Sequence, residues 1–393
     1  MNADTPTPRA AQDLRPPGTP PDPVPPATPP GGPAAGDAAS PSDPDQPVGR
    51  PIGPPFPIGE AVARSLVTAA SLAPSLHNAQ PWRFRLLADG TTLQLWADLD
   101  RVVPHADPDG RGLHLGCGAA ICNLRVAAAH AGLLPDVRLL PEPAEPRLLA
   151  DMVFRRLPAG APEPREAAGL AALYPAIRAR RTSRHPFLPE RVPGSVRAEL
   201  TEAARAEGAE LVHPDSWHTA TVLELLRDAE GRDGSDPARE RELERWTRTG
   251  PEAGSAVDGV PEYAFGPRER DGRTVVRDFA GRAPLPGRAG ADFESAPQLV
   301  LLGTDGDRPF DWLRAGEALE RVLLVATDRG LATSLSSQAL EWDELRWPTR
   351  DPMGPISHVQ MIIRLGYGPE SPPTPRRAVT EILEIGHAMP SAP

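Results

Sequence analysis

The sequence contains no lysine, so all 42 of its basic side chains are arginines. Any role that a lysine ammonium commonly has must fall to a guanidinium, which carries a fixed charge and forked donors. No stretch concentrates basic residues without acidic ones among them, and the net charge is −11. These features argue against nucleic acid or an anionic membrane as a main partner.

Cysteine and long apolar runs are also scarce. Cys117 and Cys122 lie five residues apart in a predicted helix, a spacing that suits neither a disulfide nor a C-x-x-C site. We interpret them as small buried residues. The longest apolar stretches, such as residues 322–327, are too short to span a membrane, and the N-terminus lacks the pattern of a signal peptide. We therefore expect a cytoplasmic protein.

Proline is unevenly distributed along the chain. Residues 1–55 contain 18 of the 52 prolines and almost no large apolar side chain, so they cannot bury enough surface to offset their ordering entropy. We expect a disordered tail there. The remainder has a normal share of core residues, and we divide it into a first half, residues 56–165, and a second half, residues 166–393.

Hydrophobic periodicity predicts an α+β fold. In the first half it predicts a helix over residues 59–73 that stops at Pro74, a hairpin around Asp89-Gly90, a helix over 111–132, and strands near 136–140 and 150–156. The second half repeats that order more loosely, with helices near 170–180, 195–207, 216–229 and 311–329 and strands at 298–303 and 359–365. Between them, residues 250–292 are either a disordered connection or a functional lid.

One internal similarity supports a duplicated unit. Residues 118–133 and 316–331 share small residues at equal spacing, and each segment closes with Gly-Leu, as expected at a helix C-terminus. The matched pairs are Gly118/Gly316, Ala120/Ala318, Ala128/Ala326 and Gly132/Gly330. Chance matching in an alanine-rich chain is the alternative, but the repeated order of elements favours duplication.

The segment APSLHNAQPWRF, residues 73–84, gathers polar side chains between two stiffening prolines. Ser75 and Asn78 can bond nearby backbone groups, Gln80 can reach a ligand, and Trp82 can anchor the following strand. The loop is therefore either a rigid turn whose side chains satisfy one another or a surface that holds a ligand.

Three further segments can bind an anion or present backbone to a ligand. RARRTSRHPF, residues 178–187, offers several guanidinium groups beside hydroxyls, which suits a phosphate; the alternative is a solvated basic helix end. GLATSLSSQALE, residues 330–341, follows a helix-ending glycine, where backbone N–H groups are free. PPTPRRAVTEIL, residues 372–383, is weak by itself.

Together the four segments resemble the flavin site of the nitroreductase family. PSLHNAQPW matches the family's P-S-x-x-N-x-Q-P-W loop without a gap, and RRTSR matches its R-x-S-x-K/R phosphate motif. GLATSLSSQ lies where the family lays backbone along the flavin ring, and PTPRRAV corresponds to its C-terminal basic motif. The resemblance covers residues 59–385 and implies the nitroreductase-like fold with bound FMN.

The distribution of these motifs resembles the double-length, Acg-type branch of that family. Ordinary members are homodimers with FMN at the subunit interface, whereas here the loop lies in the first half and the arginine motif in the second. The resemblance implies two fused repeats that form an intrachain pseudo-dimer, with one complete flavin site and one degenerate site. The chain itself is then expected to be a monomer or a homodimer.

The resemblance also implies roles for particular residues. Arg180, Thr182 and Arg184 fall on the positions that contact phosphate, ribityl chain and pyrimidine ring, and Arg184 is the candidate that stabilises negative charge on the reduced ring. Thr374 stands where many members have lysine, so Arg181 or Arg377 would supply the missing charge. The full set of expected FMN contacts is Pro74, Ser75, His77, Asn78, Gln80, Arg180, Arg181, Thr182, Arg184, Leu335, Ser336, Ser337, Gln338 and Arg376.

Two functions follow from the resemblance. In the first, hydride passes from NAD(P)H through FMN to a small nitroaromatic or quinone acceptor, with no metal and no catalytic side chain, because the flavin carries the chemistry. In the second, residues 250–292 cover the flavin and the protein stores or sequesters FMN. Flavin fragmentation or dehalogenation, known elsewhere in this fold, is a weaker alternative.

Overall fold

The computed structural model describes residues 54–157, 164–270, 276–281 and 285–386. The proline-rich tail expected over residues 1–55 therefore lies outside the described residues, apart from its last two. Of these, Pro55 forms a β-bridge with Arg155, next to the first sheet.

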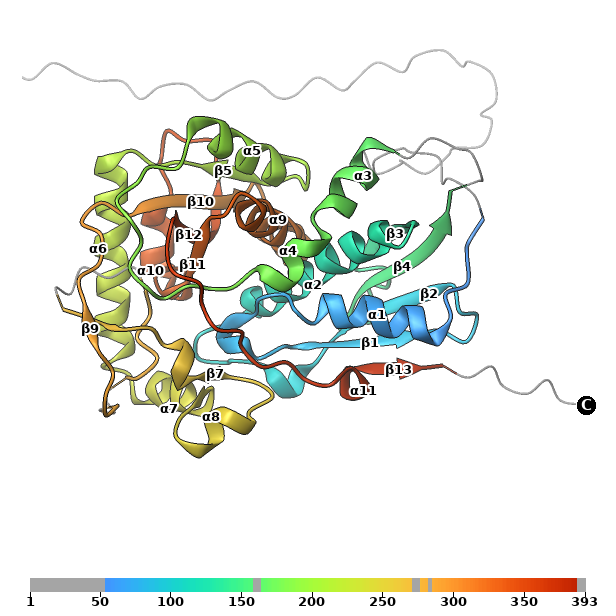
Figure 1. The fold of residues 1–393 in the computed structure, drawn as a ribbon, viewed down its shortest axis with the longest axis horizontal. Coiled ribbons are helices and arrows are strands. Elements are labelled where there is room, and N and C mark those ends of the chain that lie inside the picture. Colours follow the sequence, from blue (N-terminus) through green and yellow to red (C-terminus); the bar gives the residue numbers. More distant parts are fainter. Residues whose placement is uncertain (1–53, 158–163, 271–275, 282–284, 387–393) are drawn as a thin grey trace, which may run out of the picture. The chain divides into compact units, whose positions relative to one another are not determined.

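A five-stranded sheet forms most of the first half. The predicted hairpin is confirmed as β1 (Trp82–Leu86) and β2 (Thr92–Ala97), and β2 continues through β4 (Leu148–Arg156) to β3 (Leu133–Leu139), all antiparallel. The fifth strand, β13 (Leu383–Ile385), comes from the far C-terminus and pairs with β1 in parallel. The second half therefore completes the sheet of the first, as the red strand beside β1 shows in Figure 1.

A four-stranded antiparallel sheet forms the centre of the second half. Its strand order is β11 (Ala332–Ser336), β12 (His358–Gly366), β10 (Gln298–Thr304) and β5 (Glu210–Val212). The strands predicted over residues 298–303 and 359–365 are confirmed as β10 and β12. The strand β11 was not predicted, because its hydroxyl-rich sequence lacks the alternation of apolar and polar residues that marks a half-buried strand.

Two long helices lie between the sheets and pack directly on each other (Figure 1). They are α2 (Arg111–His130) and α9 (Pro309–Asp328), and both were predicted. A Cβ atom added to Gly118 would lie 2.1 Å from the carbonyl oxygen of Leu313, and one added to Gly316 would lie 2.2 Å from that of Leu115. Glycine at both positions thus lets the two backbones touch.

This helix contact is reciprocal in the sequence. The offset of 198 residues that relates Gly118 to Gly316 also relates Leu115 to Leu313 (316 − 118 and 313 − 115). Leu313 of α9 belongs to the apolar core of the first half, and Leu115 of α2 belongs to that of the second. Each helix thus places a leucine at an equivalent position in the apolar core of the other half. A symmetric contact of this kind is expected where two copies of one structural unit pack together.

The helix α2 is long and apolar enough to cross a membrane by length and composition, yet 83% of that window is buried inside the protein. Its buried residues include both cysteines, which are free thiols, and burial raises the pKa of each. The interpretation of Cys117 and Cys122 as small core residues is confirmed. Both features are those of the central helix of a folded domain.

The remaining predicted helices are confirmed, with one division. The helix expected over 59–73 is α1 (Glu60–Ala70), and the one expected over 170–180 is split into α3 (Arg165–Ala172) and α4 (Tyr174–Ala179). Pro175 lies in the first turn of α4, where its missing N–H costs nothing, but it cannot continue α3. The others are α5 (Gly194–Arg205) and α6 (Ser216–Asp233), which is followed by α7 (Pro237–Arg245).

Residues 250–292 lie along α6 and α7, apart from residues 271–275 and 282–284, which lie outside the described ranges (Figure 1). Their side chains Val260, Ala264, Phe265 and Phe279 form a separate small apolar cluster. The short elements just before this segment, within it and after it are β6 (Thr247–Arg248), α8 (Pro251–Ser255), β7 (Val260–Pro261), β8 (Arg268–Glu269), β9 (Gly290–Ala291), α10 (Asp343–Arg346) and α11 (Val379–Ile382).

Candidate functional site

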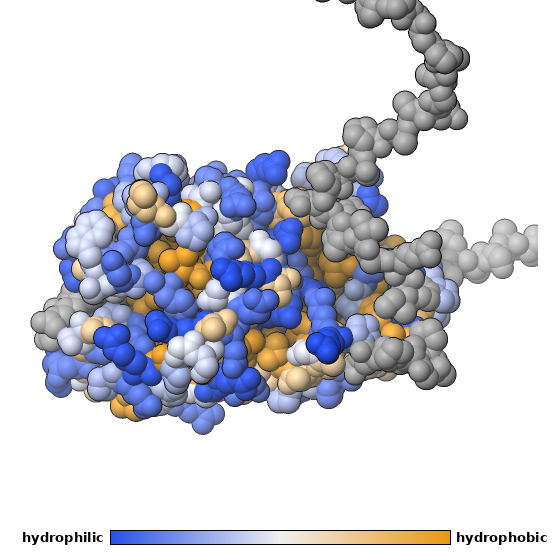
Figure 2. Space-filling view, turned by 90° about the horizontal axis from the view of Figure 1, so that it is seen from above, coloured by the Kyte–Doolittle hydropathy of each residue, from blue (hydrophilic) through white to orange (hydrophobic). Residues whose placement is uncertain are grey.

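A cavity of about 320 Å³ lies where the four polar segments of the sequence converge. In one view of the surface, apolar residues lie in recesses between hydrophilic ones (Figure 2). The wall of the cavity combines the loop after α1, the arginine segment after α4, the end of β11 and the segment before α11. The expected site residues that line it are Pro74, Ser75, His77, Asn78, Arg180, Arg181, Thr182, Arg184, Leu335, Ser337, Gln338 and Arg376.

The loop over residues 75–80 has an unusual backbone. His77, Asn78 and Gln80 have φ values of 50°, 56° and 54°, and in the described chain only Leu140 is another non-glycine residue with positive φ. Such conformations are costly for side chains with a Cβ, so surrounding contacts must hold them. Part of that support is local, since the Gln80 N–H donates to Ser75 Oγ at 2.9 Å.

Asn78 connects the loop to two distant segments. Its side-chain Nδ2 donates to the carbonyl oxygens of Gly259 (2.9 Å) and Pro375 (3.0 Å), and its Oδ1 accepts from Arg376 at 3.0 Å. The buried amide is thus satisfied on both sides. The interpretation of this loop as a self-contained turn is wrong for Asn78, which joins residues about 180 and 300 positions away.

Gln80 is fully buried and does not line the cavity. Its Nε2 donates to the carbonyl oxygen of Val257, and its Oε1 accepts from the Arg377 N–H, each at 2.9 Å. The prediction that Gln80 reaches a ligand does not fit this geometry, because both ends of the amide are already occupied. Ser336, another expected contact, is also buried outside the cavity wall.

Arginines from the segment after α4 form one end of the cavity. Arg180 is only 4% exposed, and its Nη2 donates to the carbonyl oxygen of Leu72 at 3.1 Å. Its Nη1 has no hydrogen-bond partner among the described residues. Arg178 and Arg181 line the same end and are more exposed. A buried guanidinium with an unsatisfied donor, beside two further cations, is suited to an anion such as phosphate.

Arg376 lines the cavity, but most of its guanidinium donors bind backbone carbonyl groups just after the C-terminus of α1. Its guanidinium donates to the carbonyl oxygens of Ser71 (2.7 Å), Leu72 (3.1 Å) and Ala73 (3.2 Å), which follow the helix; the Leu72 oxygen also accepts from Arg180. Burial and the neighbouring Arg180 lower the pKa of Arg376 to about 9. Arg376 thus fixes the shape of the anion-binding end more than it offers free donors.

The two candidates for the missing lysine charge are separated by the structure. Arg181 lines the cavity, whereas Arg377 lies outside its wall and pairs with the buried Asp98 at 3.1 Å. Thr374, which stands at the lysine position, lines the cavity and accepts from Arg376 Nη1 at 2.7 Å. Of the two arginines, Arg181 alone therefore borders the cavity.

His77 and Arg277 also line the cavity. The Arg277 Nη1 lies 2.6 Å from His77 Nε2, and its Nη2 donates to Glu341 at 2.7 Å. Because a guanidinium can only donate, Nε2 must accept, so the neutral imidazole carries its proton on Nδ1. Burial, together with Arg277 and Arg184, lowers the pKa of His77 well below its ordinary value.

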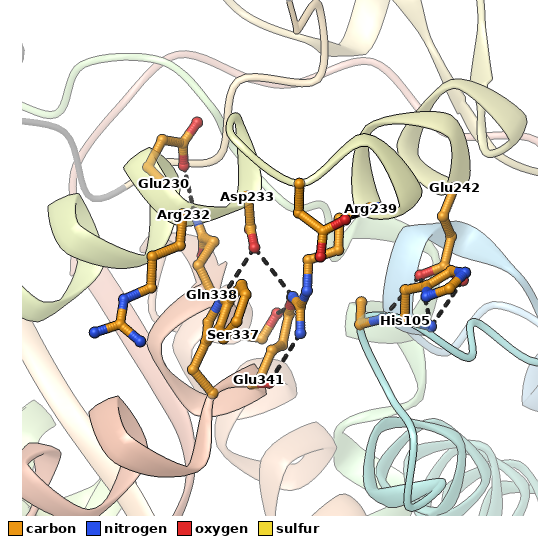
Figure 3. A network of polar contacts seen from close by, with 12 residues as sticks. His105, Glu230, Arg232, Asp233, Arg239, Glu242, Ser337, Gln338 and Glu341 are labelled. Carbon is orange, nitrogen blue, oxygen red and sulfur yellow. Dashed lines mark hydrogen bonds and ion pairs between the residues drawn. The ribbon is translucent and has the colours of Figure 1, made fainter.

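Glu341 links this part of the cavity wall to α6 and α7. It accepts from Ser337 Oγ (2.8 Å) and from Arg239 Nη1 (3.2 Å), and Arg239 also pairs with Asp233 at 3.0 Å. Figure 3 shows Asp233 and Arg239 reaching from the helices toward Glu341. Although burial opposes it, attraction to Glu341 and Asp233 raises the pKa of Arg277, so this guanidinium stays charged.

Arg184 is held by residues of the 250–292 segment. Its Nη1 donates to the carbonyl oxygen of Ala264 at 3.0 Å, and its guanidinium lies 4.6 Å from the ring centre of Phe279. Burial and the nearby Arg277 lower the pKa of Arg184 to about 10. The same segment contributes Val260, Val276, Arg277 and Phe279 to the cavity wall.

The N-terminal turns of α2 belong to the wall and were not predicted. Gly112 and Gly116 line the cavity, and a Cβ at Gly116 would lie 3.2 Å from Ser75 Cβ. Asp107 caps the helix by accepting from the N–H groups of Gly112 (2.7 Å) and Leu113 (2.8 Å). Glycines spaced by one helical turn were the available signal, because they let the loop approach the helix.

Within the described ranges, no group of three or more His, Cys, Asp or Glu side chains could hold a metal.

Comparisons with known proteins agree with the motif pattern. Residues 177–367 match the family model described as "Nitroreductase family". The chain is 33% identical to "Putative NAD(P)H nitroreductase Rv3131" of Mycobacterium tuberculosis over 84% of its own length and 92% of the relative. It is 32% identical to "Putative NAD(P)H nitroreductase acg" of the same organism, over 82% and 96%.

Similarity to solved structures is more distant. A nitroreductase of Bacteroides fragilis with bound FMN is 18% identical, with a TM-score of 0.32, over 50% of this chain and 89% of that one. The sequence relationship is the stronger finding, because the chain covers more than nine tenths of both mycobacterial relatives. The protein belongs to the nitroreductase family. Within that family its similarity is to the Acg-type proteins, along nearly their whole length.

Proposed function

We propose that the cavity binds FMN and that the protein is an NAD(P)H-dependent, FMN-containing reductase of small nitroaromatic or quinone acceptors. The observation that carries this proposal is the convergence of four sequence segments, far apart in the chain, on one cavity. The names of the mycobacterial relatives, which refer to NAD(P)H, support the choice of reductant. The unsatisfied Arg180 donor beside Arg178 and Arg181 fits the FMN phosphate.

In this proposal the two halves form an intrachain pseudo-dimer with one flavin site. The reciprocal contact of Gly118 and Gly316 supports the pseudo-dimer. A different basic cluster joins Arg125 of α2 to residues of the second half. There, Arg125 pairs with Glu207 (2.6 Å) and Glu317 (2.9 Å), and Arg321 pairs with Glu207 at 2.6 Å. Arginines that are neutralised in this way offer no charge to a second phosphate.

The residues around the cavity have distinct tasks in this proposal. Arg178, Arg180 and Arg181 would hold the phosphate, while Leu335, Ser337 and Gln338 would lie along the ring. Bound FMN would supply the redox chemistry, by accepting a hydride and passing electrons to the acceptor. Arg184, a partly buried cation that pairs with no carboxylate of the described residues, would stabilise negative charge on the ring.

Anaerobic mixing of the FMN-loaded protein with NADPH or NADH tests the proposal. We expect the flavin absorbance to bleach within the turnover time and to return when a quinone or a nitroaromatic is added. A loaded flavin that stays oxidised under both nucleotides contradicts the reductase function.

Storage or sequestration of FMN is the second candidate function, and one observation favours it. Val276, Arg277 and Phe279 of the 250–292 segment form part of the cavity wall, where they would restrict access to the flavin. A sequestering protein would keep its flavin oxidised in the experiment above and would release it slowly into buffer. Monomer and homodimer are both compatible with a site that is formed within one chain.

A further inference from the structure

Glu320 is a buried carboxylate behind the arginine-rich end of the cavity. It lies on α9, is 0% exposed, and its Oε1 is 3.4 Å from Arg180 Nε. Neither of its oxygens makes a hydrogen bond of normal geometry with another described residue. Nothing in the proposed flavin contacts assigns it a function, although an isolated buried carboxylate is costly.

The groups that face Glu320 come from three neighbouring elements. Arg180 follows α4, Arg376 lies in the segment before α11, and Asn123 and Cys122 come from α2. Burial raises the pKa of the Cys122 thiol, so it is neutral at neutral pH. Asn123 is buried and makes no hydrogen bond of normal geometry.

On its own helix, the other glutamate of this region faces elsewhere. Glu317 instead pairs with Arg125 of α2 at 2.9 Å. Among the described residues, Glu320 is thus the sole carboxylate that pairs with Arg180. When it is ionised, it offsets the charge of that guanidinium. When it is protonated, the guanidinium charge is available to an anion.

We infer that Glu320 is a positioning residue that sets how much positive charge Arg180 offers to the phosphate group of the flavin. This inference rests on the proposed FMN site. An ionised Glu320 and a phosphate dianion compete for the same guanidinium and repel each other across it. Binding of the phosphate is therefore coupled to protonation of Glu320.

The direction of the pH dependence follows from this coupling. Burial raises the pKa of Glu320 to about 7, and attraction to Arg180, the neighbouring Asn123 and Arg376 offset part of that effect. Below this pH the Glu320 carboxyl is neutral, so it does not compete with the phosphate for Arg180, and FMN binds more tightly than it does when Glu320 is ionised. As the pH rises through the folded-state pKa, the carboxylate forms and the affinity falls, by up to about tenfold per pH unit.

The experiment measures the dissociation constants of FMN and riboflavin for the flavin-free full chain between about pH 6.5 and pH 8.5. For the wild type, we expect the FMN affinity to fall across this range and the riboflavin affinity to stay level, because riboflavin lacks the phosphate. For Glu320→Gln, we expect a level FMN affinity that exceeds that of the wild type at the alkaline end. The second ionisation of the phosphate, near pH 6, is common to both proteins.

Glu317→Gln is the matched control, since it removes another buried glutamate of α9 and should keep the wild-type slope. The inference is overturned if the FMN affinity of Glu320→Gln falls with pH as steeply as that of the wild type. It is also overturned if the riboflavin affinity of the wild type falls with pH as steeply as its FMN affinity. If Glu320→Gln does not fold, the wild-type comparison of FMN with riboflavin decides alone. If no flavin binds at any pH, the proposed function itself fails, which is a separate result.

Discussion

At the scale of single residues, the absence of lysine has a physical consequence for anion binding. A guanidinium binds phosphate through two parallel donors and stays charged, but it must be held in one orientation to do so. Arg376 fixes the turn after α1, and Arg180 is held by Leu72 and Glu320. The more exposed Arg181 is then free to adapt to the ligand.

Arg181→Ala is expected to weaken FMN binding about tenfold, which corresponds to about 1.4 kcal/mol, because it removes one partly exposed charge-assisted contact. Riboflavin affinity should change little. Arg138→Ala is the control, since it removes an exposed arginine of β3 that does not line the cavity. Fluorescence titration measures all three proteins, and an unchanged FMN affinity would remove Arg181 from the site.

The residue roles could be predicted only in part from the sequence. The polar types at positions 75–80 and 178–184 indicated a binding site, and most of them line the cavity. The side chain of Gln80 instead forms hydrogen bonds with Val257 and Arg377, and the Arg376 guanidinium donates to the backbone that follows α1. Both tasks depend on segments that approach only in the folded chain, so no local pattern could show them.

At the scale of elements, the contact between α2 and α9 depends on glycine. Gly118→Ala places a methyl group against the backbone of Leu313, which cannot move without shifting the whole helix. We expect destabilisation of about 3 kcal/mol or more, the upper end for overpacking in a close contact. Chemical denaturation measures the change in the free energy of unfolding.

Gly169→Ala provides the control for this substitution. Gly169 lies within α3, is exposed, and has nothing within 4 Å of an added Cβ. Alanine should stabilise the protein there by up to about 1 kcal/mol, because it has the higher helix propensity. A harmless Gly118→Ala would contradict the account of the helix contact.

The 250–292 segment is expected to limit access to the flavin. Arg277→Ala removes the contacts with His77 and Glu341 that fasten this segment at the cavity. If these contacts contribute about 1.4 kcal/mol, their loss increases the population in which the segment has moved away from the cavity about tenfold. Because NADPH reaches the flavin only in that state, it should bleach the bound flavin about tenfold faster. Stopped-flow absorbance measures the rate.

Arg270→Ala serves as the control for this prediction. Arg270 lies in the same segment, but it pairs with Asp292 at the surface, where both side chains are more than 60% exposed. Its removal should leave the bleaching rate unchanged. Equal rates for Arg277→Ala and the wild type would mean that Arg277 does not control access.

Helices and strands with clear periodicity could be predicted, whereas elements defined by long-range pairing could not. The α2 and α9 patterns indicated both core helices within a few residues of their bounds. The short strand β13 has no pattern of its own and is fixed by pairing with β1, about 300 positions earlier. Its position follows from the fold as a whole.

At the scale of the whole molecule, the chain combines two large sheets, a reciprocal helix pair and the arginine-lined cavity described above. The cavity takes residues from both halves, so neither half could form it alone. Arg180 keeps an unsatisfied Nη1 donor at the cavity, whereas Arg125 and Arg321 each donate to a carboxylate at 2.6 Å, and this difference indicates why one site per chain is expected.

The most direct measurement is the flavin content of the full chain after saturation with FMN and removal of the excess. Flavin absorbance is compared with the protein concentration determined by amino-acid analysis. The account predicts one FMN per chain. A protein that gains no flavin absorbance, or one that binds two FMN per chain, would contradict it.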